Sequence, residues 1–593
     1  MRRRVTVVAG LAAAVLVAAA PSQAAPTLNP LVEAQNYAKT LERQAIYTSV
    51  GGQLQLRDVS NRNLAAALKA QLTDPEREFV SDLCWNGSDG CAGDARLYDW
   101  QAKGYGIVQP VLFTARDGAT LSGHVWATRA GPAKRPGIVI TNGSVQADEQ
   151  MYWYAAQALA KAGYVVLTWD PQGQGQSDTF GAAPDQREGF PAQTDGRPFF
   201  DGTEDALNFF FSTPTHPYVP ESSCSSGTSH AGKQARRVVA GLDAAYNPYW
   251  QLFSGRVGLA GHSYGAAGVS YIGQWDPRVD AIVAWDNLGQ PSAGSTGQGF
   301  PPGEAGCPAH PGDRAAATGT KPALGMSADY FLPPTPNLSY PAQTKSLASQ
   351  EYTRRGIDTG ELVIRGGSHL DFSFISNPAF GATLRGADLI DWYTTAWFDK
   401  YVKQDPTADR RLLTDRWRHD GSEAAVDPNG DGNMFSFYHP SRLAFTLADG
   451  TKLDCEDLRG GCPALSPDDG YAGEYSYVAL AHSPDGSGPA SGTGLYASGA
   501  ARACTSRRSV VVHLGRPQGA KVVRVVATVG KRTVGRARGA RVTVRLRGLP
   551  RGAYTVRLRV TLRRRGRTLH VSFTRRYRTC APQTSKKTVS RSP

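Results

Sequence analysis

Short apolar runs alternate with helical segments between residues 107 and 404. "PGIVITNG", "GYVVLTWD", "GRVGLAGHS", "RVDAIVAWDN", "KPALGMSAD" and "ELVIRGGSH" are strand-like, whereas "MYWYAAQALAKAG", "GTEDALNFFF" and "LIDWYTTAWFDKYV" are helix-like. Strands that are apolar along their whole length are buried on both faces, which is typical of a parallel sheet covered by helices. "VLFTARDGATLSGHVW" predicts a hairpin that turns at Asp117-Gly118. The sequence therefore predicts an α/β fold with a mostly parallel sheet and helices on both faces.

The chain has 593 residues, which is too long for one compact core. Changes in composition predict six regions: a signal peptide at 1–25, a helical leader at 26–105, the α/β domain at 106–405, a Gly/Asp-rich acidic extension at 406–500, a basic domain at 501–582 and a tail at 583–593. In the leader, "NLAAALKAQL" predicts a helix with Asn63 as its N-cap. The extension has no regular pattern and is expected to be irregular.

The first residues have the pattern of an export signal. Three arginines at positions 2–4 precede an apolar run at 5–20, and Ser22-Gln23-Ala24 offers a cleavage site. The run is shorter than the ~20 residues that a membrane-spanning helix needs. No later segment is apolar enough to span, so we expect a secreted protein without a transmembrane span.

Eight cysteines, at 84, 91, 224, 307, 455, 462, 504 and 580, agree with an exported protein. Neighbour pairing would give Cys84–Cys91, Cys224–Cys307, Cys455–Cys462 and Cys504–Cys580, although sequence alone does not fix connectivity. Zinc binding is the alternative, but the chain contains no C-x-x-C pair. We therefore expect disulfides.

Charge divides the chain into two parts. From Ala501 onward the sequence has 22 Arg and 4 Lys but no Asp or Glu, a charge of +26. Because the whole chain carries +14, residues 1–500 carry −12. Apolar residues and arginines alternate along 541–573 with a period of two, which predicts a small antiparallel β-sandwich.

A serine between glycines is the strongest chemical motif. Gly261-His262-Ser263-Tyr264-Gly265 fits G-x-S-x-G, in which a nucleophilic serine stands on a tight strand-to-helix turn. The strained backbone exposes the hydroxyl, and glycines on either side avoid a collision. A strand precedes the motif and a helix at 266–274 follows it. A purely structural turn is the weaker interpretation of Ser263.

The serine needs a general base, and the base needs an acid that fixes its tautomer. His369 ends the last predicted strand, in "VIRGGSHLDFS", and is the candidate base. Asp329, which ends "PALGMSAD", is the preferred acid. Asp286, which ends "AIVAWDN", is the alternative. The chain order Ser, Asp, His is that expected for this elbow.

These residues resemble the α/β-hydrolase family over roughly 107–404. The resemblance implies an oxyanion hole formed by the Tyr264 N–H and by an N–H of the loop at 142–145, with Ser144 preferred and Val145 as the alternative. The family usually has His-Gly in this loop, where the chain has Asn-Gly. "DPQGQGQSD" (170–178) resembles a structural turn of the family, and the insertion at 212–233 is expected to help set substrate choice. No cofactor and no metal is implied.

Two further features suggest ligands. Residues 427–433, "DPNGDGN", have alternating oxygen ligands like a calcium loop, but Tyr438 stands where an EF-hand has glutamate, so a solvated turn is favoured. The basic region 501–582 suggests an anionic cell-envelope polymer or anionic lipid surface rather than nucleic acid, since few aromatics could stack on bases. A solvated basic surface without a partner is the alternative.

Taken together, the motifs predict a secreted serine hydrolase that cleaves small or polymeric carboxylic esters. A secreted serine peptidase of the same fold is one alternative. A non-catalytic, envelope-binding protein with a degenerate hydrolase body is another.

Overall fold

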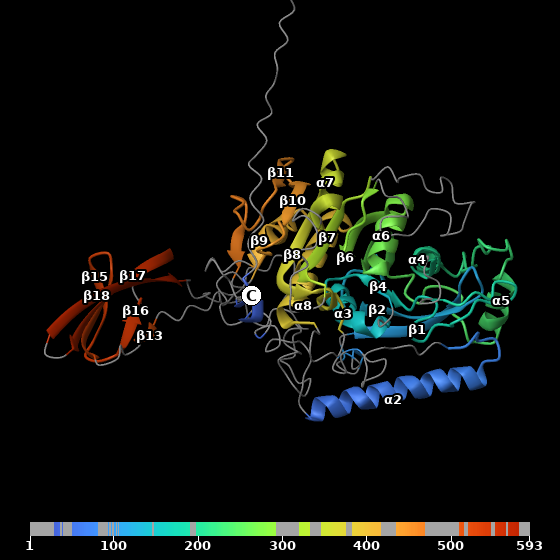
Figure 1. Cartoon of the computed structure of the whole chain (residues 1–593), viewed down its shortest axis with the longest axis horizontal. Helices are drawn as coiled ribbons and strands as arrows, with labels where there is room; N and C mark the ends of the chain where they lie inside the picture. The colour runs from blue at the N-terminus through green and yellow to red at the C-terminus, as the bar shows by residue number, and fades with distance from the viewer. Residues whose placement is uncertain are drawn as a thin grey trace, which may run out of the picture. The chain divides into compact units, whose positions relative to one another are not determined.

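A computed structural model gives the structure of the chain (Figure 1). It describes residues 29–31, 33–35, 38, 50–80, 93, 97, 100–101, 104, 106–144, 148–189, 197–291, 320–331, 345–374, 382–416, 434–468, 509–514, 520–546, 552–564 and 567–579. The chain divides into two compact units, Met1–Tyr496 and Ala497–Pro593. The predicted signal peptide lies outside the described residues.

A ten-stranded mixed sheet forms the centre of the first unit, in the order β1-β2-β4-β3-β5-β6-β7-β8-β10-β11. The six strands from β4 to β8 in this order are parallel, and the strands on either side of them are antiparallel. The strands are β1 (Gly106–Thr114), β2 (Thr120–Thr128), β3 (Arg135–Thr141), β4 (Val165–Trp169), β5 (Phe253–His262), β6 (Val279–Trp285), β7 (Ala323–Tyr330), β8 (Thr359–Ser368), β10 (Arg442–Thr446) and β11 (Lys452–Cys455). The predicted α/β class is confirmed.

Helices cover both faces of this sheet because successive side chains of each central strand point to opposite faces. Val283 of β6 belongs to the core beneath α3 (Trp153–Lys161) and α8 (Leu384–Tyr401), whereas Ile282 belongs to the core beneath α4 (Arg197–Phe211), α6 (Tyr264–Trp275) and α7 (Leu347–Arg354). The remaining helical elements are α2 (Val50–Thr73), η2 (Glu149–Tyr152), α5 (Ala231–Val239), η5 (His369–Phe372) and α9 (Asp409–Leu412).

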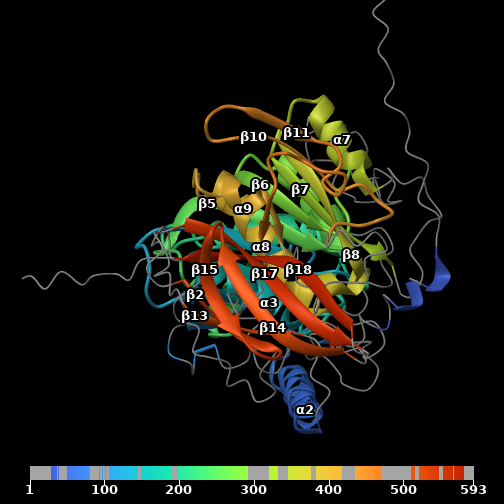
Figure 2. The ribbon, with the colours of Figure 1, turned by 90° about the vertical axis from the view of Figure 1, so that its left-hand side faces the viewer.

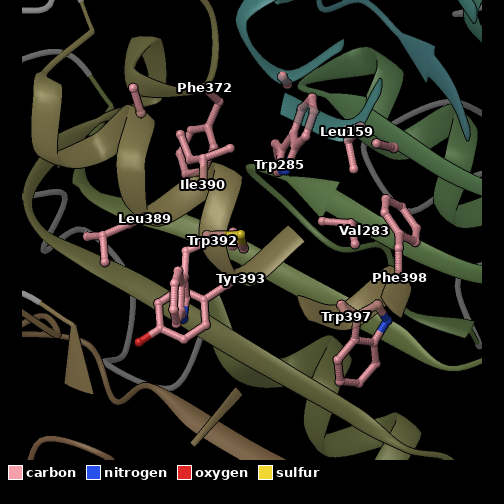
Figure 3. Close-up of a cluster of buried hydrophobic side chains, with 14 of the residues drawn as sticks. Leu159, Val283, Trp285, Phe372, Leu389, Ile390, Trp392, Tyr393, Trp397 and Phe398 are labelled. Atoms are coloured by element: carbon pink, nitrogen blue, oxygen red, sulfur yellow. The ribbon is translucent and has the colours of Figure 1, made fainter. Parts of the chain in front are cut away.

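The core on the α8 side is rich in aromatic side chains. Figure 3 shows Trp392, Tyr393, Trp397 and Phe398 of α8 among the buried residues that pack beside β6. The Trp285 indole at the end of β6 is buried and donates a hydrogen bond to Thr394 Oγ1 over 3.0 Å. Helix α8 thereby fixes the position where β6 ends.

The region 406–500 contains regular structure, which corrects the expectation of an irregular extension. Strand β10 pairs with β8 and with β11, so this region lengthens the central sheet. A further small pair, β9 (Thr414–Arg416) and β12 (Ser466–Asp468), is parallel. The run "RLAFTLADGTKL" (442–453) does have the pattern of a hairpin that turns at Asp449-Gly450, but the overall polar and Gly-rich composition of the region concealed it, and the order of strands in the sheet is a tertiary property.

One predicted disulfide, Cys455–Cys462, is present, with Cα atoms 5.8 Å apart. Cys224 is also disulfide-bonded. Its predicted partner Cys307 lies outside the described residues, as do both members of the Cys84–Cys91 and Cys504–Cys580 pairs.

The leader contains the predicted helix, but Asn63 is not its cap. Helix α2 begins at Val50, and Asn63 in its interior donates a hydrogen bond to Gln150 Oε1 over 2.7 Å. Buried ion pairs also join the leader to the α/β body: Arg77 to Asp178 and Arg237 to Asp74. The leader is therefore part of the first unit's fold.

The second unit is all-β. It contains a four-stranded antiparallel sheet in the order β15-β14-β17-β18 and a two-stranded sheet of β13 and β16. Their shared core includes Val525, Val544 and Leu558. The strands are β13 (Ser509–His513), β14 (Ala520–Val529), β15 (Arg532–Ala537), β16 (Arg541–Arg545), β17 (Gly552–Arg564) and β18 (Arg567–Thr579).

Among the described residues, no helix has the length and apolar character that crossing a membrane requires.

Candidate active site

Ser263 stands in a strained turn between β5 and α6. Its backbone has φ 56° and ψ −118°, a conformation that a non-glycine residue rarely adopts. A Cβ at Gly261 would lie 2.3 Å from the Gly265 carbonyl oxygen, and one at Gly265 would lie 2.3 Å from the carbonyl oxygens of Thr141 and Asn142. The glycines are needed because the turn, the start of α6 and the end of β3 approach each other closely.

The imidazole of His369 has a carboxylate partner. His369 Nδ1 lies 2.7 Å from Asp286 Oδ2, and both side chains are 13% exposed. Because β5, β6 and β8 are parallel, residues that follow them meet at one edge of the sheet. His262, the residue before Ser263, packs against His369 with ring centroids 4.6 Å apart. Ser263, Asp286 and His369 therefore lie at the same edge.

Asp286 remains ionised in this setting. Burial raises the pKa of its carboxyl, but the charge of Lys345 and the hydrogen bond from His369 outweigh burial, so the pKa lies below its usual value. An ionised carboxylate at Nδ1 holds the proton there and leaves Nε2 of a neutral imidazole able to accept a proton.

Asp329, the preferred acid in the sequence interpretation, has different partners. One carboxylate oxygen accepts from Arg365 Nη1 over 2.8 Å and from the Gly366 N–H over 2.7 Å, and the other accepts from the Ser436 hydroxyl. Burial raises the pKa of Asp329, but the charge of Arg365 and these hydrogen bonds lower it by more. The pKa therefore lies below its usual value, and Asp329 is also ionised. The carboxylate that contacts His369 is that of Asp286, the alternative acid of the sequence analysis, whereas the preferred Asp329 pairs with Arg365.

A signal for the pairing of Asp329 with Arg365 is present in the sequence. Arg365 lies inside the apolar strand "ELVIRGGSH", and a buried guanidinium requires a carboxylate nearby. The neighbouring strand β7 offers Asp329 for that purpose. Asp329 is therefore engaged in a structural ion pair with Arg365, and Asp286, which follows β6, is available to His369.

A hydrogen-bonded chain behind His369 is a feature that the motif search missed. The Gly143 N–H donates to Tyr152 Oη over 2.9 Å, Tyr152 Oη lies 2.8 Å from His262 Nδ1, and His262 Nε2 lies 2.9 Å from the His369 carbonyl oxygen. A carbonyl only accepts, so His262 donates from Nε2 and accepts at Nδ1 from the tyrosine hydroxyl. Burial and the nearby His369 lower the pKa of His262 well below its usual value, which keeps it neutral.

The predicted oxyanion loop lies beside the serine. A Cβ at Gly143 would be 3.2 Å from the Ser263 Cβ. Gln174 Nε2 donates to the Gly143 carbonyl over 3.1 Å, and Asp170 accepts from Asn142 Nδ2 over 3.1 Å. The 170–178 turn therefore supports this loop, as its structural interpretation predicted.

One predicted oxyanion donor, Tyr264, directly follows the serine in the chain, and the other, Ser144, follows Gly143 in the loop beside it. Tyr264 begins α6, where the backbone N–H groups of the first turn form the positive end of the helix dipole. Ser144 follows the turn at Gly143 and is partly exposed. The assignment of these two N–H groups to an oxyanion hole remains a prediction.

An exposed aromatic ring borders the site. Phe331 follows β7, its ring centroid lies 4.9 Å from that of His369, and 58% of the residue is exposed. Its carbonyl accepts from the His369 N–H over 3.2 Å. An apolar group of a substrate could pack on this ring.

In the described part of the chain, no group of three or more His, Cys, Asp or Glu side chains is arranged to hold a metal ion. The candidate calcium loop 427–433 lies outside the described residues.

Comparison of the sequence with protein-family models and with curated proteins found no match.

Proposed function

We propose that the protein is a serine hydrolase of the α/β-hydrolase type that cleaves carboxylic esters. The observation that carries the proposal is Ser263 in a strained turn between two glycines, at the sheet edge where His369 is hydrogen-bonded to Asp286. Strain of this kind is retained at functional sites, because a merely structural turn has cheaper solutions. The mostly parallel sheet with helices on both faces supports the family resemblance.

In this mechanism Ser263 Oγ attacks the ester carbonyl carbon, and its proton moves to His369 Nε2. The Asp286 carboxylate stabilises the imidazolium through Nδ1–H. The tetrahedral intermediate collapses, the C–O bond breaks, and His369 gives the proton to the departing alkoxide. Water, deprotonated by His369, then attacks the acyl carbon. The bond from this carbon to Ser263 Oγ breaks, His369 returns the proton to Oγ, and the carboxylic acid leaves. Backbone N–H groups of Tyr264 and Ser144 would stabilise the oxyanion by roughly 3 kcal/mol each.

The direct test is covalent labelling by a fluorophosphonate probe. The wild-type protein should be labelled on Ser263 and lose esterase activity in proportion, whereas Ser263→Ala should show neither labelling nor turnover. Absence of labelling in folded wild-type protein would instead favour the non-catalytic, envelope-binding alternative.

A peptidase of the same architecture is the second candidate, because the triad attacks esters and amides alike. The partly exposed Phe331 beside His369 is compatible with an apolar group of either substrate. Parallel assays with nitrophenyl esters and aminoacyl-nitroanilides distinguish them, and preferential amide cleavage would overturn the ester assignment.

We also propose that the protein acts outside the cytoplasm and that its second unit retains it on an anionic polymer of the cell envelope. The disulfide Cys455–Cys462 supports an oxidising compartment. The charge of +26 after residue 500, without any Asp or Glu, supports a polyanionic partner.

A further inference from the structure

The cations of the second unit are concentrated on one face of its four-stranded sheet. In β17, Val556, Leu558, Val560 and Leu562 are buried in the core, so the alternating Arg557, Arg559 and Arg563 point to the opposite face and are exposed. Figure 2 shows the four strands of this sheet.

The strand register extends this face across the sheet. Arg563 lies opposite Lys521, Thr561 opposite Arg524, and Arg559 opposite Val526, which in turn lies opposite Arg536. Directly opposed residues share a face. We call the resulting surface the arginine face, formed by Lys521, Arg524, Arg536, Arg557, Arg559 and Arg563, all of which are exposed.

Hydroxyl side chains accompany these cations. Ser572 lies opposite Arg559, Thr574 opposite Arg557, and Thr568 opposite Arg563. Arginine, lysine, serine and threonine are the side chains that contact phosphate groups in proteins. Two residues along a strand span about 7 Å, so a linear chain of closely spaced phosphates can meet several of these groups at once.

Phenylalanine, tyrosine and tryptophan do not belong to the described part of this face, whereas His570, opposite Thr561, contributes one exposed imidazole ring to it. Phe573 and Tyr577 pack against the core, and Tyr554 lies opposite Tyr577. Sequence-tolerant binding of single-stranded nucleic acid relies on aromatic rings on which bases stack. A single imidazole does not form a row of rings, so the described part of the face has the groups for phosphates and no continuous platform for bases.

Repulsion between these cations lowers the stability of the second unit, and binding of an anionic partner would relieve it. The second unit contains no side-chain carboxylate, so the six cations have no acidic partner within it and repel one another. The core residues lie on the other face, so the arginines are not needed to form it.

We infer that the arginine face is the binding surface for a linear, phosphate-bearing polymer without bases, such as a polyol phosphate. This inference rests on the proposed retention and names the surface and the chemistry of its ligand. Arginine provides two parallel hydrogen bonds to one phosphate, which a point charge does not.

The test measures binding of the full-length protein to a labelled inorganic polyphosphate chain as a function of salt concentration. The variant Arg557→Gln/Arg559→Gln/Arg563→Gln removes three cations of the face. Arg538→Gln/Arg541→Gln/Arg545→Gln is the matched control, because it removes the same charge from exposed positions on and beside β16.

The face variant should bind roughly 100-fold more weakly at 0.1 M salt. The slope of log K against log salt concentration should become smaller in magnitude by about 2, as expected for three lost phosphate contacts. The control should lose less than about 5-fold. An equal loss of affinity in both variants would overturn the assignment of the binding surface to the arginine face. It would still be compatible with retention of the protein by its net positive charge.

Two further outcomes are informative. No binding by wild-type protein would overturn both the retention and the face. Tighter binding of single-stranded DNA of equal charge through the same arginines would overturn the base-free ligand. Turnover of a small soluble ester should be unchanged in both variants, so these failures remain distinguishable from a failure of the hydrolase proposal.

Discussion

The two units use arginine in opposite ways. In the first unit Arg116, Arg237, Arg365 and Arg416 are buried, and each is matched by one or more carboxylates. In the second unit the cations of the arginine face are exposed, and no Asp or Glu is present to pair with them. The same residue type therefore fixes the fold in one unit and forms a surface in the other.

The difference follows from desolvation. A guanidinium inside a protein is tolerated only with a hydrogen-bonded carboxylate, so each buried arginine selects a partner and fixes the elements that carry it. Arg365, for example, joins β8 to Asp329 of β7 and to Glu33 of the leader. An exposed guanidinium keeps its water, constrains little and remains available to an external anion.

The largest expected effect separates the carboxylates of Asp286 and Asp329 in the first unit. Asp286→Asn should lower kcat about 10⁴-fold while the stability changes little, because the amide no longer stabilises the imidazolium or holds the correct tautomer. Asp329→Asn should instead destabilise the fold and leave most of the kcat of the folded enzyme. Ester turnover measured beside urea unfolding distinguishes them. The opposite pattern would restore Asp329 as the orienting acid.

The second prediction compares arginines across the units. Arg365→Met should lower the free energy of unfolding by about 3–5 kcal/mol, because Asp329 and Glu33 would lose their buried partner. Arg559→Met should change it by less than about 0.5 kcal/mol, since the side chain is exposed. Denaturant unfolding monitored by hydrogen exchange in each unit provides both values. Similar losses would remove the contrast between the units.

The third prediction concerns pH. Despite burial, Arg365 holds the pKa of Asp329 below its usual value, so the stabilisation by this carboxylate is fully present above the unfolded pKa of about 3.9. It is lost as the pH falls through the lower folded-state pKa. The stability difference between wild type and Asp329→Asn should therefore be constant near neutral pH and shrink below about pH 4. A difference unchanged down to pH 2 would contradict the ion pair.

The smallest expected effect concerns the uncharged hydrogen-bonded chain from Tyr152 through His262 to the His369 carbonyl. Tyr152→Phe removes the donor to His262 Nδ1 and should lower kcat roughly 10-fold, about 1.4 kcal/mol, with KM nearly unchanged. Tyr152 would then be a positioning residue for His369, because His262 donates to the His369 carbonyl. The pH profile of kcat should shift as well. A loss of stability with an unchanged profile would reduce Tyr152 to a packing residue.

Local patterns in the sequence carried much of the fold. Continuous apolar strands, the Asp117-Gly118 hairpin and the period-two alternation of 541–573 correspond to β1–β8 and β16–β18. The glycines on either side of Ser263 also predicted a tight turn, because only a residue without a Cβ fits at their positions. Such features depend on neighbours along the chain, so they are visible in the sequence.

Tertiary structure decided which carboxylate faces His369, that β10 and β11 extend the sheet, and that Glu33 of the leader pairs with Arg365. Asp286 and Asp329 both end apolar strands, and only the side-chain directions and the competing guanidinium of Arg365 distinguish them. Partner choice depends on which distant groups share a buried volume, where unpaired charge is costly. Arg365 within an apolar strand indicates that a carboxylate is buried beside it, but only the fold determines which carboxylate that is.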